Sequence, residues 1–223
     1  MDVDLRLYAL IDPAVAGGRR LGDLASRIAG STTLVQLRDK HGSTRAMVAE
    51  ARELTAVLAP LDIPLLINDR VDVALAAEAD GVHIGQDDMS PADARLLLGK
   101  TAIIGLSIKT IEQAKAAPLD LLDYVGVGGV YATTSKDATS APIGISGLRT
   151  IVQTIRARKA NFPICGIAGI NAGNAAEVIA AGADGVAVIS ALSLAADPAQ
   201  AAENLLGVVD GALARRVNKD GQP

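Results

Sequence analysis

The sequence predicts an α/β protein that folds as a single-domain (β/α)8 barrel, also called a TIM barrel. Apolar runs typical of buried parallel strands alternate with helical patterns from one end to the other. We expect eight strand–helix pairs, and 223 residues lie within the usual size of such a barrel. The chain also contains an internal repeat: residues 64–85 resemble residues 163–190, as expected for two similar half-barrels.

The composition excludes several classes of partner. Half of the residues are hydrophobic and the net charge is −4, with only three tyrosines, one phenylalanine and no tryptophan. A nucleic-acid binder needs a basic face and aromatic stacking platforms, so we expect no nucleic-acid partner. The single cysteine, Cys165, lies in an apolar strand pattern and is expected to be a buried, reduced thiol.

No membrane partner is expected either. No stretch approaches the roughly 20 apolar residues of a membrane span. The first residues, M-D-V-D-L-R, lack the basic flank and the apolar run of a signal peptide. We therefore expect a cytoplasmic protein, and the sequence leaves a monomer and a homo-oligomer both open.

The expected strands are short and apolar without clear alternation, which is typical of strands buried on both faces. An open doubly wound sheet is the alternative fold, but no G-x-G-x-x-G turn follows the first expected strand. The strands are expected at residues 5–11, 33–37, 64–67, 81–84, 102–106, 124–130, 164–168 and 185–189.

Helix starts can be recognised between these strands. Ser90 followed by Pro91 is typical of a capping residue and a proline at the first helical position. Thr110 and Gln113 have the spacing of a capping box. Asn171 is expected to cap a helix that ends near residue 182.

The longest helices are expected at residues 44–58 and 147–159. The end of the chain is polar and is expected to fray. We therefore expect one barrel domain over residues 1–216 and a disordered tail over residues 217–223. No linker or shift in composition divides the chain.

The stretch from residue 123 to 142 joins a strand to a polar loop. Its apolar part is broken by three glycines, and glycine in a strand marks a bend or a close approach to the backbone. Thr133, Thr134, Ser135 and Lys136 then follow in a row. Hydroxyl groups beside a lysine, just past a strand end, suit an anionic ligand. The alternative is a surface loop with a solvated lysine.

Three hydrogen-bond donors lie at and just past the end of the second expected strand. Alternation along a strand puts Gln36, Arg38 and Lys40 on one side. Two of the three are cations, so together they could surround a phosphate. The alternative is an exposed loop in which Arg38, Asp39 and Lys40 pair with one another.

Carboxylates follow the third and fourth expected strands. Asn68 and Asp69 directly follow the third strand, and Asp87 and Asp88 lie just past the fourth. Because the two strands are neighbours, Asp69 is expected close to one of the other two carboxylates. Such a pair suits Mg²⁺, which takes one or two protein carboxylates and completes its shell with water and phosphate oxygens. Helix capping is the alternative for each carboxylate.

The remaining strand ends carry His83, Ser107, Gly169 and Ser190. His83 is expected to be a hydrogen-bonded strand-end residue rather than a base or a zinc ligand. Ser107 could cap a turn or contact a ligand. Loops seven and eight of barrels often bind phosphate through backbone N–H groups. Gly169 and Ser190 therefore indicate a second anion site, although Gly169 could simply turn the chain.

Seven short motifs in this order resemble the thiamine phosphate synthase family over about residues 5 to 213. That resemblance implies an enzyme that joins 4-amino-2-methyl-5-(diphosphooxymethyl)pyrimidine to 4-methyl-5-(2-phosphooxyethyl)thiazole and releases pyrophosphate. It also implies Mg²⁺ as cofactor and a dissociative mechanism, in which the C–O bond breaks before the thiazole nitrogen attacks. The motifs are Q-L-R-D-K (36–40), I-N-D-R (67–70), V-H-I-G-Q-D-D (82–88), G-L-S (105–107), G-V-Y-A-T-T-S-K-D (129–137), G-I-A-G-I (166–170) and A-D-G-V-A-V-I-S (183–190).

The resemblance also implies roles for individual residues. The metal ligands would be Asp69 and Asp88, and the catalytic residues would be Lys136, Arg38 and Ser107. The pyrimidine diphosphate would contact Gln36, Arg38, Lys40, Asn68, Ser107 and Lys136. The thiazole phosphate would contact Thr133, Thr134, Ser135, Gly169, Ile189 and Ser190.

The sequence departs from the family pattern mainly on the thiazole side. A pair of glycines usual in the family is Ala168 and Gly169 here, and Gly129 and Ala132 replace prolines of the loop after the sixth strand. Lys109 stands where a neutral residue or a histidine is expected. The residues expected to hold the diphosphate and Mg²⁺ are all present.

Three other functions fit such a barrel less well. A thiazole tautomerase needs neither diphosphate nor metal, so it would leave Arg38, Asp69 and Asp88 without a role. A phosphate-handling epimerase would need a facing acid–base pair, which the sequence does not show. A non-catalytic barrel that binds a thiamine precursor would keep the same residues but would show no turnover.

Overall fold

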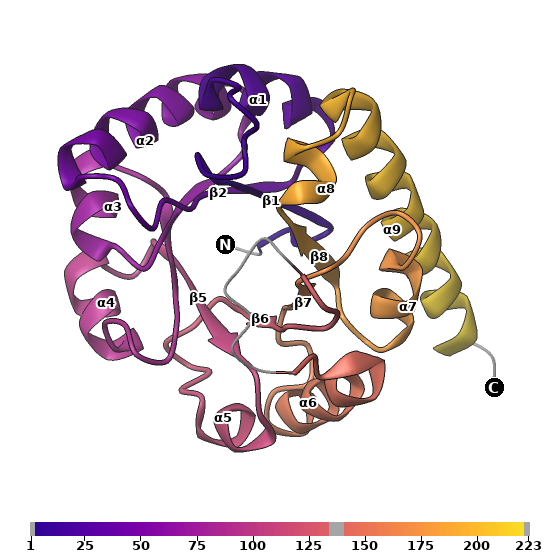
Figure 1. Ribbon diagram of the computed structural model, residues 1–223. Coiled ribbons are helices and arrows are strands. Elements are labelled where there is room, and N and C mark those ends of the chain that lie inside the picture. Colours follow the sequence, from indigo (N-terminus) through magenta and orange to yellow (C-terminus); the bar gives the residue numbers. More distant parts are fainter. Residues whose placement is uncertain (1–2, 134–140, 221–223) are drawn as a thin grey trace.

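The chain folds into a closed barrel of eight parallel strands surrounded by helices (Figure 1). The computed structural model describes residues 3–133 and 141–220, with side chains described as far as Val217. Each strand pairs with the next one in the sequence, and β8 pairs with β1 to close the ring. The strands are β1 (Leu7–Ile11), β2 (Leu34–Leu37), β3 (Leu65–Asn68), β4 (Gly81–Ile84), β5 (Ile103–Ile108), β6 (Tyr124–Val127), β7 (Ile164–Ile167) and β8 (Gly185–Val188).

Helices follow every strand and cover the outside of the barrel (Figure 1). None of the helices described is both long and apolar enough to cross a membrane. The α-helices are α1 (Leu21–Ile28), α2 (Thr44–Leu58), α3 (Val71–Ala77), α4 (Pro91–Leu98), α5 (Ile111–Ala116), α6 (Gly144–Arg158), α7 (Ala175–Ala180), α8 (Ser190–Ser193) and α9 (Pro198–Asp220), with 3-10 turns at Ala29–Ser31 and Ala59–Leu61.

All eight strands lie where the sequence predicts them, and their ends differ from the prediction by at most three residues. The largest difference is at β6, which ends at Val127. Beyond it, the Val130 N–H donates to the Ile167 carbonyl of β7 (2.9 Å), and the Tyr131 N–H donates to the Ala168 carbonyl (3.1 Å). The segment after β6 therefore follows the end of β7 and leads the polar loop toward that side of the barrel.

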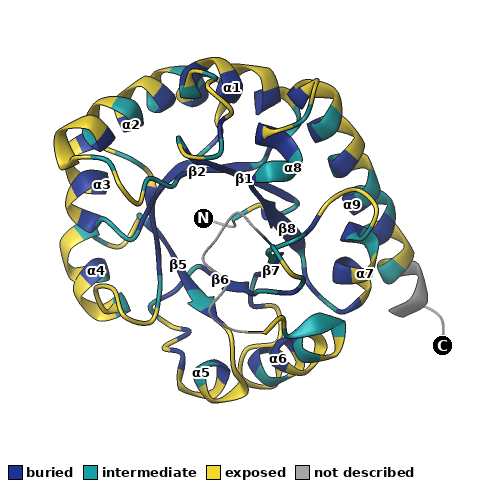
Figure 2. Ribbon diagram, in the orientation of Figure 1, coloured by how far each residue is buried: buried dark blue, intermediate teal, exposed yellow. Residues whose placement is uncertain are grey.

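Two apolar clusters stabilise the barrel. The outer one lies between the strands and the buried faces of the helices (Figure 2). The inner one fills the lumen, and burial on both faces explains why the strands show no alternation. Cys165 belongs to the inner cluster and is a buried thiol, as expected. The inner cluster consists of Leu5, Tyr8, Leu10, Leu34, Leu66, Ile103, Tyr124, Cys165, Ala187 and Ile189.

The local signals for helix starts are confirmed in two cases and wrong in one. The side chains of Ser90 and Thr110 each accept a hydrogen bond from a backbone N–H in the first turn of their helix. The helix α7, however, has Asn174 rather than Asn171 at its N-cap. The Asn171 side chain instead accepts a hydrogen bond from the Gly173 N–H (2.8 Å), which makes a separate turn ahead of the helix.

The internal repeat in the sequence corresponds to a repeated contact at the amino ends of the strands. Asp80, just before β4, accepts a hydrogen bond from the Leu65 N–H of β3 (2.8 Å). Asp184, just before β8, accepts one from the Ile164 N–H of β7 (3.0 Å). Asp123 makes the same contact from β6 to β5. These carboxylates therefore tie neighbouring strands together in both halves of the barrel.

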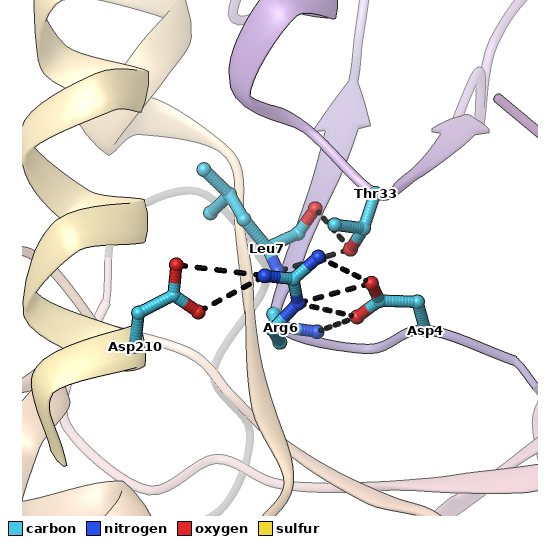
Figure 3. Close-up of polar contacts among 5 residues, drawn as sticks. All are labelled: Asp4, Arg6, Leu7, Thr33 and Asp210. Carbon is cyan, nitrogen blue, oxygen red and sulfur yellow. Dashed lines mark hydrogen bonds and ion pairs between the residues drawn. The ribbon is translucent and has the colours of Figure 1, made fainter. Parts of the chain in front are cut away.

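The first strand is tied to the last helix (Figure 3). The Arg6 guanidinium donates to Asp4 (2.8 Å) and to Asp210 of α9 (3.2 Å). The Leu7 N–H donates to the Thr33 hydroxyl (3.1 Å), which joins the start of β1 to the segment before β2. The region where the barrel closes is therefore held by polar contacts as well as by strand pairing.

The long helices differ slightly from the expected ranges. The helix α2 has the predicted bounds, whereas α6 begins three residues earlier than predicted, at Gly144. The helix α9 continues to Asp220 and so includes residues 217–220, which the sequence analysis assigned to the tail. The domain boundary at residue 216 stays a prediction.

Candidate active site

Several side chains selected from the sequence lie at the carboxyl ends of the strands, where barrels of this kind carry their active sites. Gln36, Asn68 and His83 come from the neighbouring strands β2, β3 and β4. Their exposed fractions are 1%, 9% and 8%, respectively. This end of the lumen is therefore lined by buried polar groups.

Two cations follow β2, and each of them contacts a carboxylate. Arg38 pairs with Asp12, which follows β1 and is only 2% exposed. Lys40 pairs with Asp69, which follows β3. Asp39 accepts hydrogen bonds from two backbone N–H groups of its own loop. The alternative in which Arg38, Asp39 and Lys40 pair with one another is therefore wrong.

Asp69 and Asp88 lie close together, as neighbouring strand ends predict. Burial raises the pKa of the Asp88 carboxyl, and its hydrogen bond with Asp69 raises it further. Asp88 also accepts a hydrogen bond from the Gly85 N–H (2.7 Å). The N-cap residue of α3 is Arg70, and that of α4 is Ser90. Helix capping is therefore the wrong explanation for both carboxylates.

This acidic pair has the donor chemistry of a magnesium site. Two crowded carboxylates repel each other when both are ionised, and a divalent cation between them would remove that repulsion. Within the described ranges, no group of three or more acidic, histidine or cysteine side chains is placed to hold a metal ion. Mg²⁺ needs only one or two carboxylates when a substrate phosphate completes its shell. The residues present therefore fit an ion that is shared with a phosphorylated ligand.

A chain of hydrogen bonds crosses the lumen. Gln36 Nε2 donates to the Tyr8 hydroxyl, whose oxygen lies 2.8 Å from the Tyr124 hydroxyl oxygen. The Tyr124 hydroxyl is 2.8 Å from His83 Nδ1, and His83 Nε2 is 2.9 Å from Ser107 Oγ. The prediction that His83 is a hydrogen-bonded strand-end residue is confirmed. The chain connects Gln36 and Ser107, two residues for which the resemblance implies contact with the pyrimidine.

Two buried polar atoms at this end of the lumen have no protein partner among the described residues. They are Gln36 Oε1, which is an acceptor, and Asn68 Nδ2, which is a donor. Buried polar groups nearly always have a partner, so these atoms are available to a ligand. A donor and an acceptor on neighbouring strands suit the amino group and ring nitrogen of an aminopyrimidine.

A separate pocket lies at the ends of β7 and β8. Its lining includes Thr133, Gly169, Ile189 and Ser190, all of which are predicted for the thiazole phosphate. Gly169 has a φ of +67°, and a Cβ there would lie 2.5 Å from the Ala132 carbonyl oxygen. The helix α8 begins at Ser190, and the first N–H groups of a helix lack intrahelical partners. Backbone N–H groups are therefore available to an anion in this pocket.

Three predicted site residues, Thr134, Ser135 and Lys136, lie outside the described residues. Thr133 directly precedes them and lines the pocket at β7 and β8. The roles of these three residues stay predictions.

Sequence reasoning missed Asp12, Tyr8 and Tyr124. Asp12 directly follows β1, as Asp69 directly follows β3, so its place at a strand end was an available signal. Tyr8 and Tyr124 are two of only three tyrosines in the chain, which was a weaker signal. Because the strands are apolar on both faces, the pattern did not distinguish side chains that face the lumen from those that face the helices.

The chain is similar to known proteins along most of its length. The family model described as thiamine monophosphate synthase matches residues 7–192. A thiamine-phosphate synthase from Chloroflexus aurantiacus is 47% identical over 208 residues, which cover 93% of this chain and 94% of the relative. One from Agrobacterium fabrum is 46% identical over 215 residues, which cover 96% and 98%.

Solved structures show the same similarity. Thiamine phosphate pyrophosphorylase from Pyrococcus furiosus superposes with a TM-score of 0.82 at 35% identity, covering 95% of this chain and 98% of that one. An orotidine 5'-phosphate decarboxylase from Pyrococcus horikoshii, at 15% identity and a TM-score of 0.68, shares the fold alone. The family match includes all eight strands and both groups of site residues. The chain therefore belongs to the thiamine monophosphate synthase family.

Proposed function

We propose that this chain performs the reaction of its family with Mg²⁺ as cofactor and by a dissociative mechanism. As a thiamine-phosphate synthase it is a transferase that joins the pyrimidine and thiazole precursors and releases pyrophosphate. The proposal is carried by the contacts among Lys40, Asp69 and Asp88 on one side of the barrel mouth. The separate pocket at Gly169 and Ser190 supports a second phosphorylated substrate.

Loss of pyrophosphate is the step that depends most on the charges of this site. Breaking the C–O bond leaves negative charge on the diphosphate and a pyrimidinylmethyl cation that the ring amino group stabilises. Arg38 and Lys40 neutralise the leaving group, and we assign Lys136 as a third cation. Charges that are fixed in place before the reaction lower the barrier without reorganising. Mg²⁺, held by Asp69 and Asp88, would supply further charge neutralisation at the diphosphate oxygens.

The other residues orient the two substrates. Gln36, Asn68 and Ser107 hold the pyrimidine ring, since two of them carry buried atoms without a protein partner among the described residues. The second pocket holds the thiazole phosphate so that the ring nitrogen faces the cation, and this positioning replaces a strong base. We assign this second role to Thr133, Thr134, Ser135, Gly169, Ile189 and Ser190.

We propose that the protein acts on small phosphorylated molecules in the cytoplasm. The net charge of −4 supports the absence of a nucleic-acid partner. The buried Cys165 thiol is compatible with a reducing compartment.

The metal assignment can be tested with a matched pair of variants, Asp88→Asn and Asp87→Asn. Both residues are exposed and adjacent, but only Asp88 is described in contact with Asp69. We expect Asp88→Asn to raise the Mg²⁺ concentration for half-maximal pyrophosphate release by about 10- to 100-fold. Asp87→Asn should leave it unchanged. An unchanged titration for Asp88→Asn, or a shift confined to Asp87→Asn, contradicts the assignment.

A further inference from the structure

Tyr8, Tyr124 and His83 are the inner links of the hydrogen-bond chain that crosses the lumen from Gln36 to Ser107. We propose that Tyr8, Tyr124 and His83 are positioning residues that fix the Gln36 amide and the Ser107 hydroxyl against the pyrimidine ring. This inference rests on the proposed function, in which Gln36 and Ser107 contact the pyrimidine. It adds Tyr8, Tyr124 and His83 to the residues that position the pyrimidine in that reaction.

The packing of the lumen fixes the two phenol rings. Tyr8 and Tyr124 are 1% and 0% exposed, and their rings meet edge to face with centroids 5.8 Å apart. Gly105 on β5 makes room for the Tyr124 ring, because a Cβ at that position would lie 2.2 Å from Tyr124 Cζ. The Tyr124 ring is therefore packed directly against the β5 backbone, and the two phenol rings are packed against each other.

The direction of the hydrogen bonds follows from counting protons. Gln36 Nε2 donates to the Tyr8 oxygen, so the Tyr8 proton is left for the Tyr124 oxygen. A buried donor without a partner is costly, so Tyr124 in turn donates to His83 Nδ1. His83 then carries its proton on Nε2 and donates it to Ser107 Oγ. The Ser107 hydroxyl proton is thereby directed to the ligand.

This direction determines what each end of the chain presents. At one end, Gln36 Oε1 is a buried acceptor without a protein partner in the described ranges. At the other end, Ser107 presents a donor. An aminopyrimidine offers an amino donor and ring-nitrogen acceptors, so it matches both ends. If the chain ran in reverse, both ends would present the opposite polarity and the match would be lost.

The phenols are suited to transmit this direction because they stay protonated. Burial raises the pKa of Tyr8 and that of Tyr124 above the usual value. A neutral hydroxyl donates one hydrogen bond and accepts another, which each link in the chain requires.

The variant Tyr124→Phe breaks the chain in the middle while keeping the ring in place. We expect kcat/KM for the pyrimidine diphosphate to fall about 10- to 100-fold, because Ser107 and Gln36 are no longer held in the matching orientation. The KM for the thiazole phosphate should stay unchanged, because the second pocket lies at β7 and β8. Tyr8→Phe breaks the neighbouring link and should also lower kcat/KM for the pyrimidine diphosphate. It provides the test if Tyr124→Phe does not fold.

Ile103→Val is the matched control for a change in lumen packing. Ile103 lies in the same inner cluster as the tyrosines, and its side chain has no polar atom that could join the hydrogen-bond chain. We expect this variant to keep the wild-type kcat/KM for the pyrimidine diphosphate. A wild-type kcat/KM in both phenylalanine variants, or an equal loss in Ile103→Val, overturns the proposal.

The tautomer of His83 gives a readout that does not depend on turnover. The chain has two histidines, and His41→Gln removes the ¹⁵N signal of the exposed one. In ligand-free protein we expect the His83 proton on Nε2 rather than on Nδ1, and we expect Tyr124→Phe to shift that tautomer balance. A proton on Nδ1 in the wild type overturns the proposal. If the wild type releases no pyrophosphate, the proposed function fails, while the tautomer measurement still decides the hydrogen-bond chain.

Discussion

Ala168, at the end of β7, is held in a conformation that normally favours glycine. Its φ is +83°, a region where a Cβ costs roughly 1–2 kcal/mol. The Tyr131 N–H donates to the Ala168 carbonyl (3.1 Å), so the segment after β6 fixes this turn. The family pattern that the sequence resembles has glycine at this position. The departure at Ala168 therefore costs stability but leaves the pocket at Gly169 intact.

Substitution of these two neighbours should have opposite effects. We expect Ala168→Gly to stabilise the protein by about 0.5–1 kcal/mol, since relief of strain exceeds the added entropy of the unfolded chain. Gly169→Ala should destabilise it and weaken thiazole phosphate binding, because the new Cβ would lie 2.5 Å from the Ala132 carbonyl oxygen. Thermal unfolding and the KM for the thiazole phosphate measure the two effects. Destabilisation by Ala168→Gly would show that the turn is not strained.

Glu50 on α2 has an unfavourable environment for a charge. Burial raises the pKa of its carboxyl, and the negative charges of Asp39 and Glu53 raise it further. Its Oε2 atom is buried without a partner among the described residues. Because the folded-state pKa lies above the unfolded one, folding stability falls as the pH rises through this interval, and the cost is complete at neutral pH.

The substitution Glu50→Gln should therefore raise the Tm at pH 7, and this gain should vanish well below pH 4.5, the ordinary pKa of the group. Asp72→Asn provides a control of opposite sign, because hydrogen bonding to Arg70 lowers the pKa of Asp72. Its contribution is present at neutral pH and is lost as the pH falls through the folded-state pKa. Unfolding scans at several pH values measure both. An equal gain for Glu50→Gln at all pH values contradicts the electrostatic explanation.

The paired strands depend on the carboxylates at their amino ends to different degrees. Asp184 accepts from the Ile164 N–H and also pairs with Arg156 and Arg216. Asp80 makes the equivalent backbone contact but is exposed and has no ion pair in the described part of the chain. The same sequence motif therefore has an additional role in the second half-barrel, where it ties α6 and α9 to the sheet.

We expect Asp184→Ala to destabilise the protein by about 2–3 kcal/mol, because it removes the carboxylate partner of two half-buried guanidinium groups and the acceptor of one strand N–H. Asp80→Ala should cost only about 1 kcal/mol, because a single, partly buried hydrogen bond is lost and no ion pair goes with it. Urea unfolding of both variants gives the comparison. Equal costs would mean that the arginine pairs add nothing to the stability of the second half-barrel.

The sequence predicts an element well when the residues that determine its ends are neighbours in the chain. It predicts an element poorly when its ends depend on contacts with distant residues. The starts of α4 and α5 follow from the capping residues Ser90 and Thr110 alone. The start of α7 does not, because Asn171 and Asn174 are equally suitable caps by residue type, and the Asn174 side chain bonds to the backbone of Asn171 and Gly169 rather than to the first turn of the helix. The end of β6 also could not be predicted, since it depends on hydrogen bonds to β7, a strand that lies far along the chain.

At the scale of the whole molecule, the barrel places the strand ends side by side, and this explains which parts of the site were predictable. Asp69 and Asp88 were expected to meet because their strands are neighbours in sequence and in space. The hydrogen bond between Tyr8 and Tyr124 joins residues 116 positions apart and crosses the lumen. No local pattern encodes such a contact, so the positioning residues could be found only once the barrel had formed.

The central claim is that one barrel brings a diphosphate site and a second phosphate site together for a single condensation. The most direct test is pyrophosphate release by the purified protein given either precursor alone or both, with and without Mg²⁺. We predict release only with both precursors and the metal, together with one thiamine phosphate for each pyrophosphate. No release with both precursors and Mg²⁺ present, from protein shown to be folded, would contradict the account.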